Sequence, residues 1–136
     1  MKHECNHFVL SCIDFRFHEA ISEWVKENNF VGDYDLVSLA GAQKNVANPE
    51  TRDFFMNQLA ISVRLHKTNT ILLLAHQDCG AYGGSKAFAS WAEEKAKYTE
   101  DLNIAEATIK NVYPEMKVKK IILEWKVKFG EVTVVN

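Results

Sequence analysis

Apolar residues gather in short runs along this chain, and stretches with helical periodicity separate the runs. Residues 70–75, TILLLA, show no alternation of apolar and polar positions, which is typical of a strand buried on both faces of a sheet. Residues 8–13, FVLSCI, predict a second buried strand. Residues 35–39 and 117–125 predict two more, so we expect four strands.

Helical segments separate these strands. Residues 17–28 place apolar side chains on one face and charged side chains on the other. Asn48-Pro49 is typical of a helix start, a capping side chain followed by proline, and this helix is expected to run to about His66. Further along, residues 86–97 and 100–112 predict two helices, or one helix with a break near Thr99.

The end of the chain breaks the alternation of strand and helix. Phe129-Gly130 predicts a turn, and residues 131–135 alternate apolar and polar positions like an exposed edge strand. The whole pattern predicts an α/β fold, with a mostly parallel four-stranded sheet flanked by helices and an antiparallel C-terminal edge strand. Ligands of such sheets bind beyond the carboxyl ends of the strands, where the order of the strands reverses.

Composition narrows the class of protein. The 136 residues fit one hydrophobic core, so we expect a single domain over residues 1–136. The net charge of −2 argues against nucleic acid and anionic membrane surfaces as partners, and no apolar run approaches the length of a membrane span. The polar N-terminus shows no apolar signal segment, so we expect a cytoplasmic protein. Its three cysteines are odd in number and widely spaced, which argues against a disulfide framework and leaves metal binding, catalysis or inert thiols.

Two of the cysteines fall where a ligand is expected. Cys12 lies at the carboxyl end of the first predicted strand, and His76 and Cys79 follow the third. If those two strands are neighbours, the three side chains converge on one crevice. Two thiolates and an imidazole suit zinc, and three protein ligands leave a fourth position open, as in catalytic zinc sites.

A carboxylate and a guanidinium follow Cys12 at every second position. Cys12, Asp14 and Arg16 share one face if the strand continues through them. Asp14 could be a fourth zinc ligand, or it could accept a hydrogen bond from a water on the metal. Arg16 can bind the carboxylate through two hydrogen bonds and so decide between these roles. We therefore treat Asp14 and Arg16 as candidate catalytic residues.

Two motifs together resemble the β-class carbonic anhydrases. They are Cys-x-Asp-x-Arg over residues 12–16 and His-x-x-Cys-Gly-Ala over residues 76–81, and looser similarity runs from about residue 8 to residue 87. The resemblance implies Cys12, His76 and Cys79 as zinc ligands, with Asp14 and Arg16 as a gating pair. It also implies reversible hydration of carbon dioxide to bicarbonate through zinc-bound hydroxide, in a homodimer or a higher multiple of dimers. Substrate-pocket backbone is then expected at Ala40, Gly41 and Gly80.

Departures from the family pattern leave the reaction open. Residues 38–42 read Ser-Leu-Ala-Gly-Ala where the family usually has Arg-Asn-Ala-Gly-Asn, and the first strand begins without the helices that usually precede it. A relative that hydrolyses carbonyl sulfide or carbon disulfide fits the same metal site. So does a catalytically silent zinc-containing binding or regulatory protein in which Asp14 closes the fourth position.

A second group of potential ligands lies near the N-terminus. His3, Cys5 and His7 would present three ligands on one face if this segment were extended. We interpret the group as a solvated terminus and strand entry rather than as a second metal site.

Overall fold

The computed structural model describes residues 2–126 and 131–135, and the turn expected at Phe129-Gly130 lies outside them. The described strands form one sheet in the order β2-β1-β3-β4-β5. Their bounds are β1 (His7–Ser11), β2 (Tyr34–Ser38), β3 (Thr70–His76), β4 (Lys117–Lys126) and β5 (Glu131–Val135). The first four are parallel, which confirms the predicted α/β class and parallel sheet, and β5 pairs with β4 in antiparallel register.

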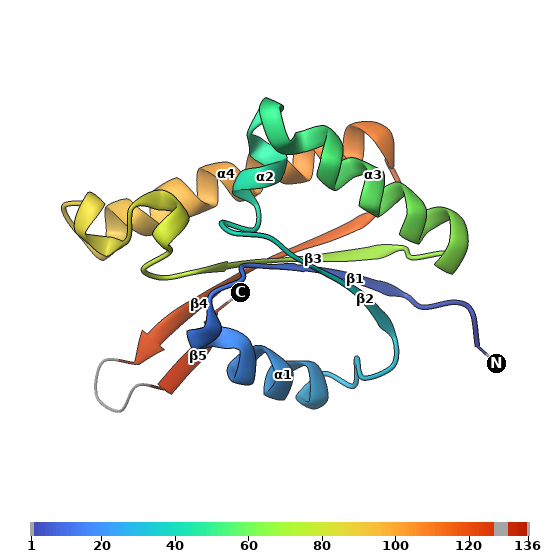
Figure 1. The fold of residues 1–136 in the computed structure, drawn as a ribbon, viewed down its shortest axis with the longest axis horizontal. Coiled ribbons are helices and arrows are strands. Elements are labelled where there is room, and N and C mark those ends of the chain that lie inside the picture. The colour runs from blue at the N-terminus through green and yellow to red at the C-terminus, as the bar shows by residue number, and fades with distance from the viewer. Residues whose placement is uncertain (1, 127–130, 136) are drawn as a thin grey trace.

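Helices cover both faces of this sheet. Figure 1 shows α1 on one face and α2, α3 and α4 on the other. The helices are α1 (His18–Glu27), α2 (Lys44–Ala47), α3 (Pro49–His66) and α4 (Trp91–Val112), with 3-10 turns η1 (Phe15–Phe17), η2 (Gly80–Tyr82) and η3 (Ser85–Ala87). Within the described residues, no helix combines the length and apolar character that crossing a membrane requires.

Helix boundaries follow side-chain caps. The start of α3 was predicted correctly, because Asn48 Oδ1 accepts a hydrogen bond from Glu50 N at 3.0 Å. The expected helix start at residue 86 was wrong, because Ser90 Oγ caps α4 by accepting from Glu93 N at 3.2 Å. Nor does the helix break near Thr99, whose hydroxyl donates to Lys95 O at 2.8 Å and stays within the helical ladder.

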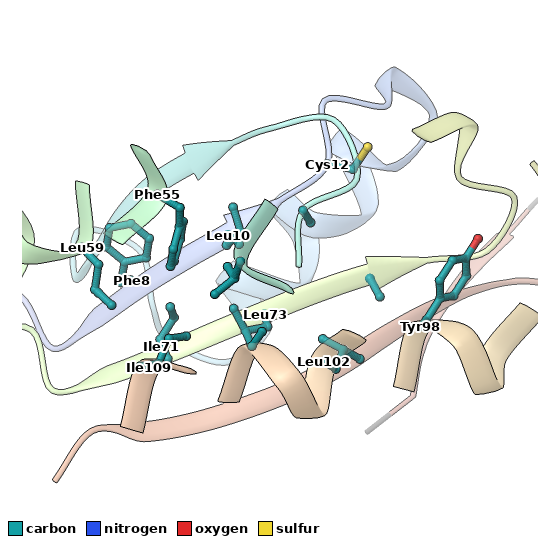
Figure 2. Close-up of a cluster of buried hydrophobic side chains, with 14 of the residues drawn as sticks. Phe8, Leu10, Cys12, Phe55, Leu59, Ile71, Leu73, Tyr98, Leu102 and Ile109 are labelled. Atoms are coloured by element: carbon teal, nitrogen blue, oxygen red, sulfur yellow. The ribbon is translucent and has the colours of Figure 1, made fainter. Parts of the chain in front are cut away.

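The core has two layers, one on each face of the sheet. Phe8, Leu10, Ile71 and Leu73 belong to the cluster that faces α2–α4, and Figure 2 shows them together with labelled side chains of α3 and α4. The alternate residues of the same strands, such as Val9 and Leu72, belong to a smaller cluster with α1 side chains on the other face. Both layers require β1 and β3 to be buried on both faces, as their apolar runs predict.

The strand order reverses between β1 and β3. The chain leaves β1 for β2 on one side and enters β3 on the other, and β1 and β3 are hydrogen-bonded neighbours. Cys12 follows the last residue of β1, and His76 is the last residue of β3. The fold therefore brings the two ends together at the position where open α/β sheets bind ligands.

Candidate metal centre

Three donor atoms meet at this reversal point. One ligand atom each from Cys12, His76 and Cys79 lies within 4.8 Å of the other two. The two sulfurs are 4.0 Å apart, and the three residues are 8 %, 2 % and 2 % exposed. In Figure 2 the sulfur of Cys12 lies at the edge of the cluster of core side chains. Buried donors at this spacing could hold a metal ion.

The imidazole of His76 is oriented for such a role. Its Nδ1 lies 2.8 Å from the Gln77 carbonyl, an acceptor to which only a protonated nitrogen can donate. Nε2 is then the nitrogen with the free lone pair, and it is buried without a hydrogen-bond partner. The Phe17 ring packs 4.3 Å away, centroid to centroid, and fixes the ring plane. A buried polar atom without a partner costs free energy, and a metal ion at Nε2 would remove that cost.

The two buried thiols titrate together. The contact with the Cys79 sulfur, 4.0 Å away, lowers the pKa of Cys12 to about 4 despite burial. The interaction with the Cys12 sulfur, followed by burial, raises the pKa of Cys79. Cys12 is therefore the thiolate of the pair, and a cation between the sulfurs would stabilise a second thiolate.

An ion pair stands beside the donors. Arg16 donates to Asp14 from Nε at 3.0 Å and from Nη2 at 2.6 Å, and the Arg16 backbone N donates to the same carboxylate at 3.0 Å. These hydrogen bonds lower the pKa of Asp14 to about 2. Asp14 Oδ2 also lies 3.9 Å from His76 Nε2, so the carboxylate faces the donor set while Arg16 holds it.

The expectation that a strand places Asp14 and Arg16 on one face was wrong. β1 ends at Ser11, and residues 15–17 form the 3-10 turn η1 with Asp14 as its cap. Asp14 and Arg16 meet because the chain turns, not because a strand places them on one face.

Two of the three expected backbone positions lie against the donors. Gly41 N donates to Cys12 Sγ at 3.4 Å, and Gly80 follows Cys79 at the start of η2. Gly41 has φ +83°, and a Cβ there would lie 2.9 Å from the Cβ of Ala81. The carbonyl of Ala40 accepts from Asn45 Nδ2 at 2.8 Å, a contact within the same loop. A glycine is required at position 41 for the loop to approach Cys12.

A family model described as "Putative carbonic anhydrase" matches residues 2–135. The chain belongs to this family. The family expected from the two motifs is thereby confirmed, and the family implies a small-molecule substrate.

Two relatives found by sequence comparison are both described as uncharacterised proteins. A protein of Rickettsia bellii (strain RML369-C) is 29 % identical over 126 residues, which are 88 % of this chain and 77 % of that protein. One of Rickettsia conorii (strain ATCC VR-613 / Malish 7) is 28 % identical over 126 residues, or 88 % and 68 % of the two chains. Among solved structures, the β-carbonic anhydrase CafA of Aspergillus fumigatus matches with a TM-score of 0.47 at 13 % identity, over 98 % of this chain and 76 % of that one.

Sequence reasoning missed a residue of this family member's candidate site. Asp78 Oδ2 accepts from Arg16 Nη1 at 2.8 Å, and the Asp78 carbonyl accepts from Nη2 at 3.0 Å. The signal was in the second motif, where Asp78 stands between His76 and Cys79, but its partner lies 62 residues away. Asp78 has φ +59°, so its carboxylate and its carbonyl can both turn to the guanidinium.

Behind Asp78, a buried carboxylate supports the loop. Glu94 is 1 % exposed, and its Oε1 accepts from Asp78 N at 2.6 Å and from Tyr98 OH at 2.7 Å. Tyr98 OH in turn accepts from Cys79 N at 3.2 Å. The backbone of Asp78 and Cys79 is therefore hydrogen-bonded to side chains of α4. These bonds hold Asp78 close to Arg16 and Cys79 close to Cys12.

Proposed function

We propose that this protein is a zinc-dependent carbonic anhydrase that interconverts carbon dioxide and bicarbonate. The observation that carries the proposal is the convergence of Cys12, His76 and Cys79, with Nε2 of His76 buried and unpartnered. Family membership supports the same activity.

Zinc fits this donor set. Two thiolates and one imidazole are ligands that zinc prefers, and a set of three leaves one coordination position for a small molecule. When bound, zinc supplies a Lewis acid that lowers the pKa of a water molecule. The residues around it must then orient that water, accept its proton and admit the substrate.

Asp14 is the group that orients the water in this proposal. Arg16 engages both carboxylate oxygens, so Asp14 is withheld from the metal and acts as a hydrogen-bond acceptor rather than as a fourth ligand. Its low pKa keeps it ionised throughout the neutral range. Arg16 is itself fixed by Asp78, so the acceptor has one orientation.

The same site favours a homodimer. Phe15 and Ile13 flank Asp14 and are 82 % and 58 % exposed, and Leu36 on the edge strand β2 is 55 % exposed. Apolar side chains at this exposure beside a candidate active site are typical of a surface covered by a partner. We propose that a second copy of the chain covers them and encloses the substrate.

Carbon dioxide hydration by the purified chain, followed by stopped-flow with a pH indicator, tests the proposal. Zinc content is measured on the same sample by elemental analysis. We expect zinc-dependent activity in the wild type and its loss in His76→Gln, because the amide cannot replace the imidazole nitrogen. His18→Gln is the matched control, since His18 is exposed on α1 and is not one of the three donors.

The proposal fails if the zinc-loaded wild type hydrates carbon dioxide no faster than buffer. It also fails if His76→Gln keeps the activity of the wild type. Light scattering that reports only monomer at micromolar concentration contradicts the dimer.

A further inference from the structure

We propose a second cation site, held by Cys5, Asp35 and His66 at the end of the sheet opposite the first donor set. It would take a zinc-like divalent ion. One ligand atom from each residue lies within 4.8 Å of the other two. In Figure 1 the N-terminal segment, the start of β2 and the end of α3 meet at this end of the sheet. The site goes beyond the proposed function, since it shares no residue with the catalytic group.

The proposed donor set differs from the N-terminal group of His3, Cys5 and His7. His7 Nδ1 lies 3.1 Å from Asp33 Oδ2, and the ring stacks on Phe30 at 4.2 Å, so His7 belongs to another contact. Cys5 is tied instead to the end of α3 by a hydrogen bond from its N to His66 O at 2.9 Å. Cys5, Asp35 and His66 come from three separate segments, which is why sequence spacing does not reveal them.

The distances suit one ion. Ligand atoms around a tetrahedral zinc lie roughly 3.3–3.8 Å from one another. His66 Nδ1 and Asp35 Oδ2 are 2.7 Å apart, while the full set spans up to 4.8 Å. His66 and Asp35 are 41 % and 29 % exposed at their side chains, so both can rotate to accept an ion between them.

Asp35 is oriented from behind, as metal-binding carboxylates usually are. Ser62 Oγ donates to Asp35 Oδ2 at 2.6 Å, and Thr68 Oγ1 lies 3.0 Å from Ser62 Oγ. Ser62 and Thr68 are both buried, so this support is fixed. Partners of this kind hold a ligand in position and raise metal affinity.

The carbonyl end of α3 favours a cation near His66. The 18-residue helix α3 ends at His66, and the carbonyl end of a helix carries a partial negative charge. Burial, followed by the charges of Asp35 and Asp33, raises the pKa of the Cys5 thiol. Lys2 is the nearby cation, and its Nζ is paired with Asp33 Oδ1 at 3.2 Å.

There is room for the ion and for a further ligand. A cavity of about 260 Å³ is lined by Cys5, Asp35 and His66, together with His3 and Glu4. An ordinary histidine–aspartate hydrogen bond accounts for Asp35 and His66, but it does not account for a thiol and a second imidazole on the same cavity wall. His3 is the side chain we expect to complete the coordination.

Zinc binding to the full-length protein tests this inference. Metal-free protein is titrated with Zn²⁺ against a chromophoric chelator, and with Co²⁺ to follow the sulfur-to-cobalt charge-transfer band. We expect Cys5→Ser to bind one ion fewer per chain than the wild type, because replacement of a ligand costs more than the roughly 10–100-fold seen for outer partners. Asp35→Asn and His66→Gln should lose the same ion.

Controls separate this site from the first one and from misfolding. His18→Gln and Asp53→Asn change exposed residues of the same types and should bind as many ions as the wild type. Circular dichroism establishes that each variant is folded. Equal zinc stoichiometry and affinity in the wild type and in folded Cys5→Ser would overturn the second site. Loss of carbon dioxide hydration in His76→Gln bears only on the first site.

Discussion

The two ends of the sheet hold two donor sets built in opposite ways. Cys12, His76 and Cys79 are almost fully buried and lie at the ends of the strands at the centre of the sheet. Cys5, Asp35 and His66 are half-buried and come from a terminal segment, an edge strand and a helix end. The side chains of the first set are already held in place by burial. In the second set, the hydrogen bond between His66 and Asp35 must break before an ion can bind between them.

Burial of the donor atoms separates the two sets in the free energy of desolvation that metal binding requires. At the first set, Nε2 of His76 has given up water without gaining a protein partner, so the protein has already met the cost of desolvation. At the second set, solvent and the hydrogen bond between His66 and Asp35 compete with a metal. The first set should therefore bind more tightly and carry the chemistry, and the second should bind more weakly and act on structure.

The largest effect on activity is expected from replacing a cysteine of the first donor set, with a cysteine of the second set as the comparison. Cys79→Ser should lower kcat/KM for carbon dioxide hydration by more than about 100-fold, because it removes a ligand rather than an outer partner. Cys5→Ser should leave it within about twofold. Stopped-flow rates at saturating zinc check both variants. Equal losses would mean that the two ends do not differ in role.

Removal of the guanidinium should have the next largest effect. Arg16→Ala frees Asp14 to approach the metal and removes its orientation, so we expect activity to fall by about 10²–10⁴-fold. Zinc content should stay at the wild-type level, since Arg16 is not a ligand. Elemental analysis and rate measurements on the same sample separate these readouts, and an Arg16→Ala protein of wild-type rate would remove the ion pair from the mechanism.

Asp78 should matter through Arg16. Asp78→Asn weakens the hydrogen bond to Arg16 Nη1, and we expect a fall in kcat/KM of roughly 10–100-fold. The double variant with Arg16→Ala should be no slower than Arg16→Ala alone, because the two residues act on the same group. Additive losses would instead assign Asp78 an independent role.

A smaller effect on stability is expected at Gly41. Gly41→Ala places a Cβ 2.9 Å from the Cβ of Ala81 at φ +83°, whereas Gly32→Ala meets nothing within 4 Å at φ +74°. Both variants carry the backbone strain of roughly 1–3 kcal/mol, and only the first adds the clash. Urea denaturation should therefore show a larger loss for Gly41→Ala, with similar losses for the two contradicting the close approach of this loop.

The smallest effect is expected in acid. The pKa of Asp14 is lowered from 3.8 to about 2 by Arg16. The stability that it contributes is therefore fully present above about pH 4 and is lost as the pH falls toward 2. Denaturation at about pH 5 and pH 2.5 should show that Asp14→Asn loses less stability on acidification than the wild type does. Asp53→Asn serves as the control, and identical pH dependence of all three proteins would argue against the ion pair.

Much of the parallel sheet could be predicted from sequence, because burial on both faces leaves a continuous apolar run such as residues 70–75. Asn48-Pro49 also predicted the start of α3, whereas the start of α4 was missed, because its cap at Ser90 lies within a polar stretch where several starts are compatible with the helical pattern. Cys12, His76 and Cys79 could be predicted to converge because strand ends in parallel sheets meet. Asp78 and the set around Cys5 could not, since their partners depend on how helices and loops pack.

The position of His76 on β3 has a kinetic consequence. β3 is paired with β1 on one edge and β4 on the other, and all seven of its residues are buried. Amides in such a strand exchange with deuterium only when the molecule opens globally. A chelator should therefore strip a metal from His76 slowly, with the same denaturant dependence as β3 exchange. An ion at Cys5 lies near solvent and should dissociate through local fluctuations, without opening of the sheet.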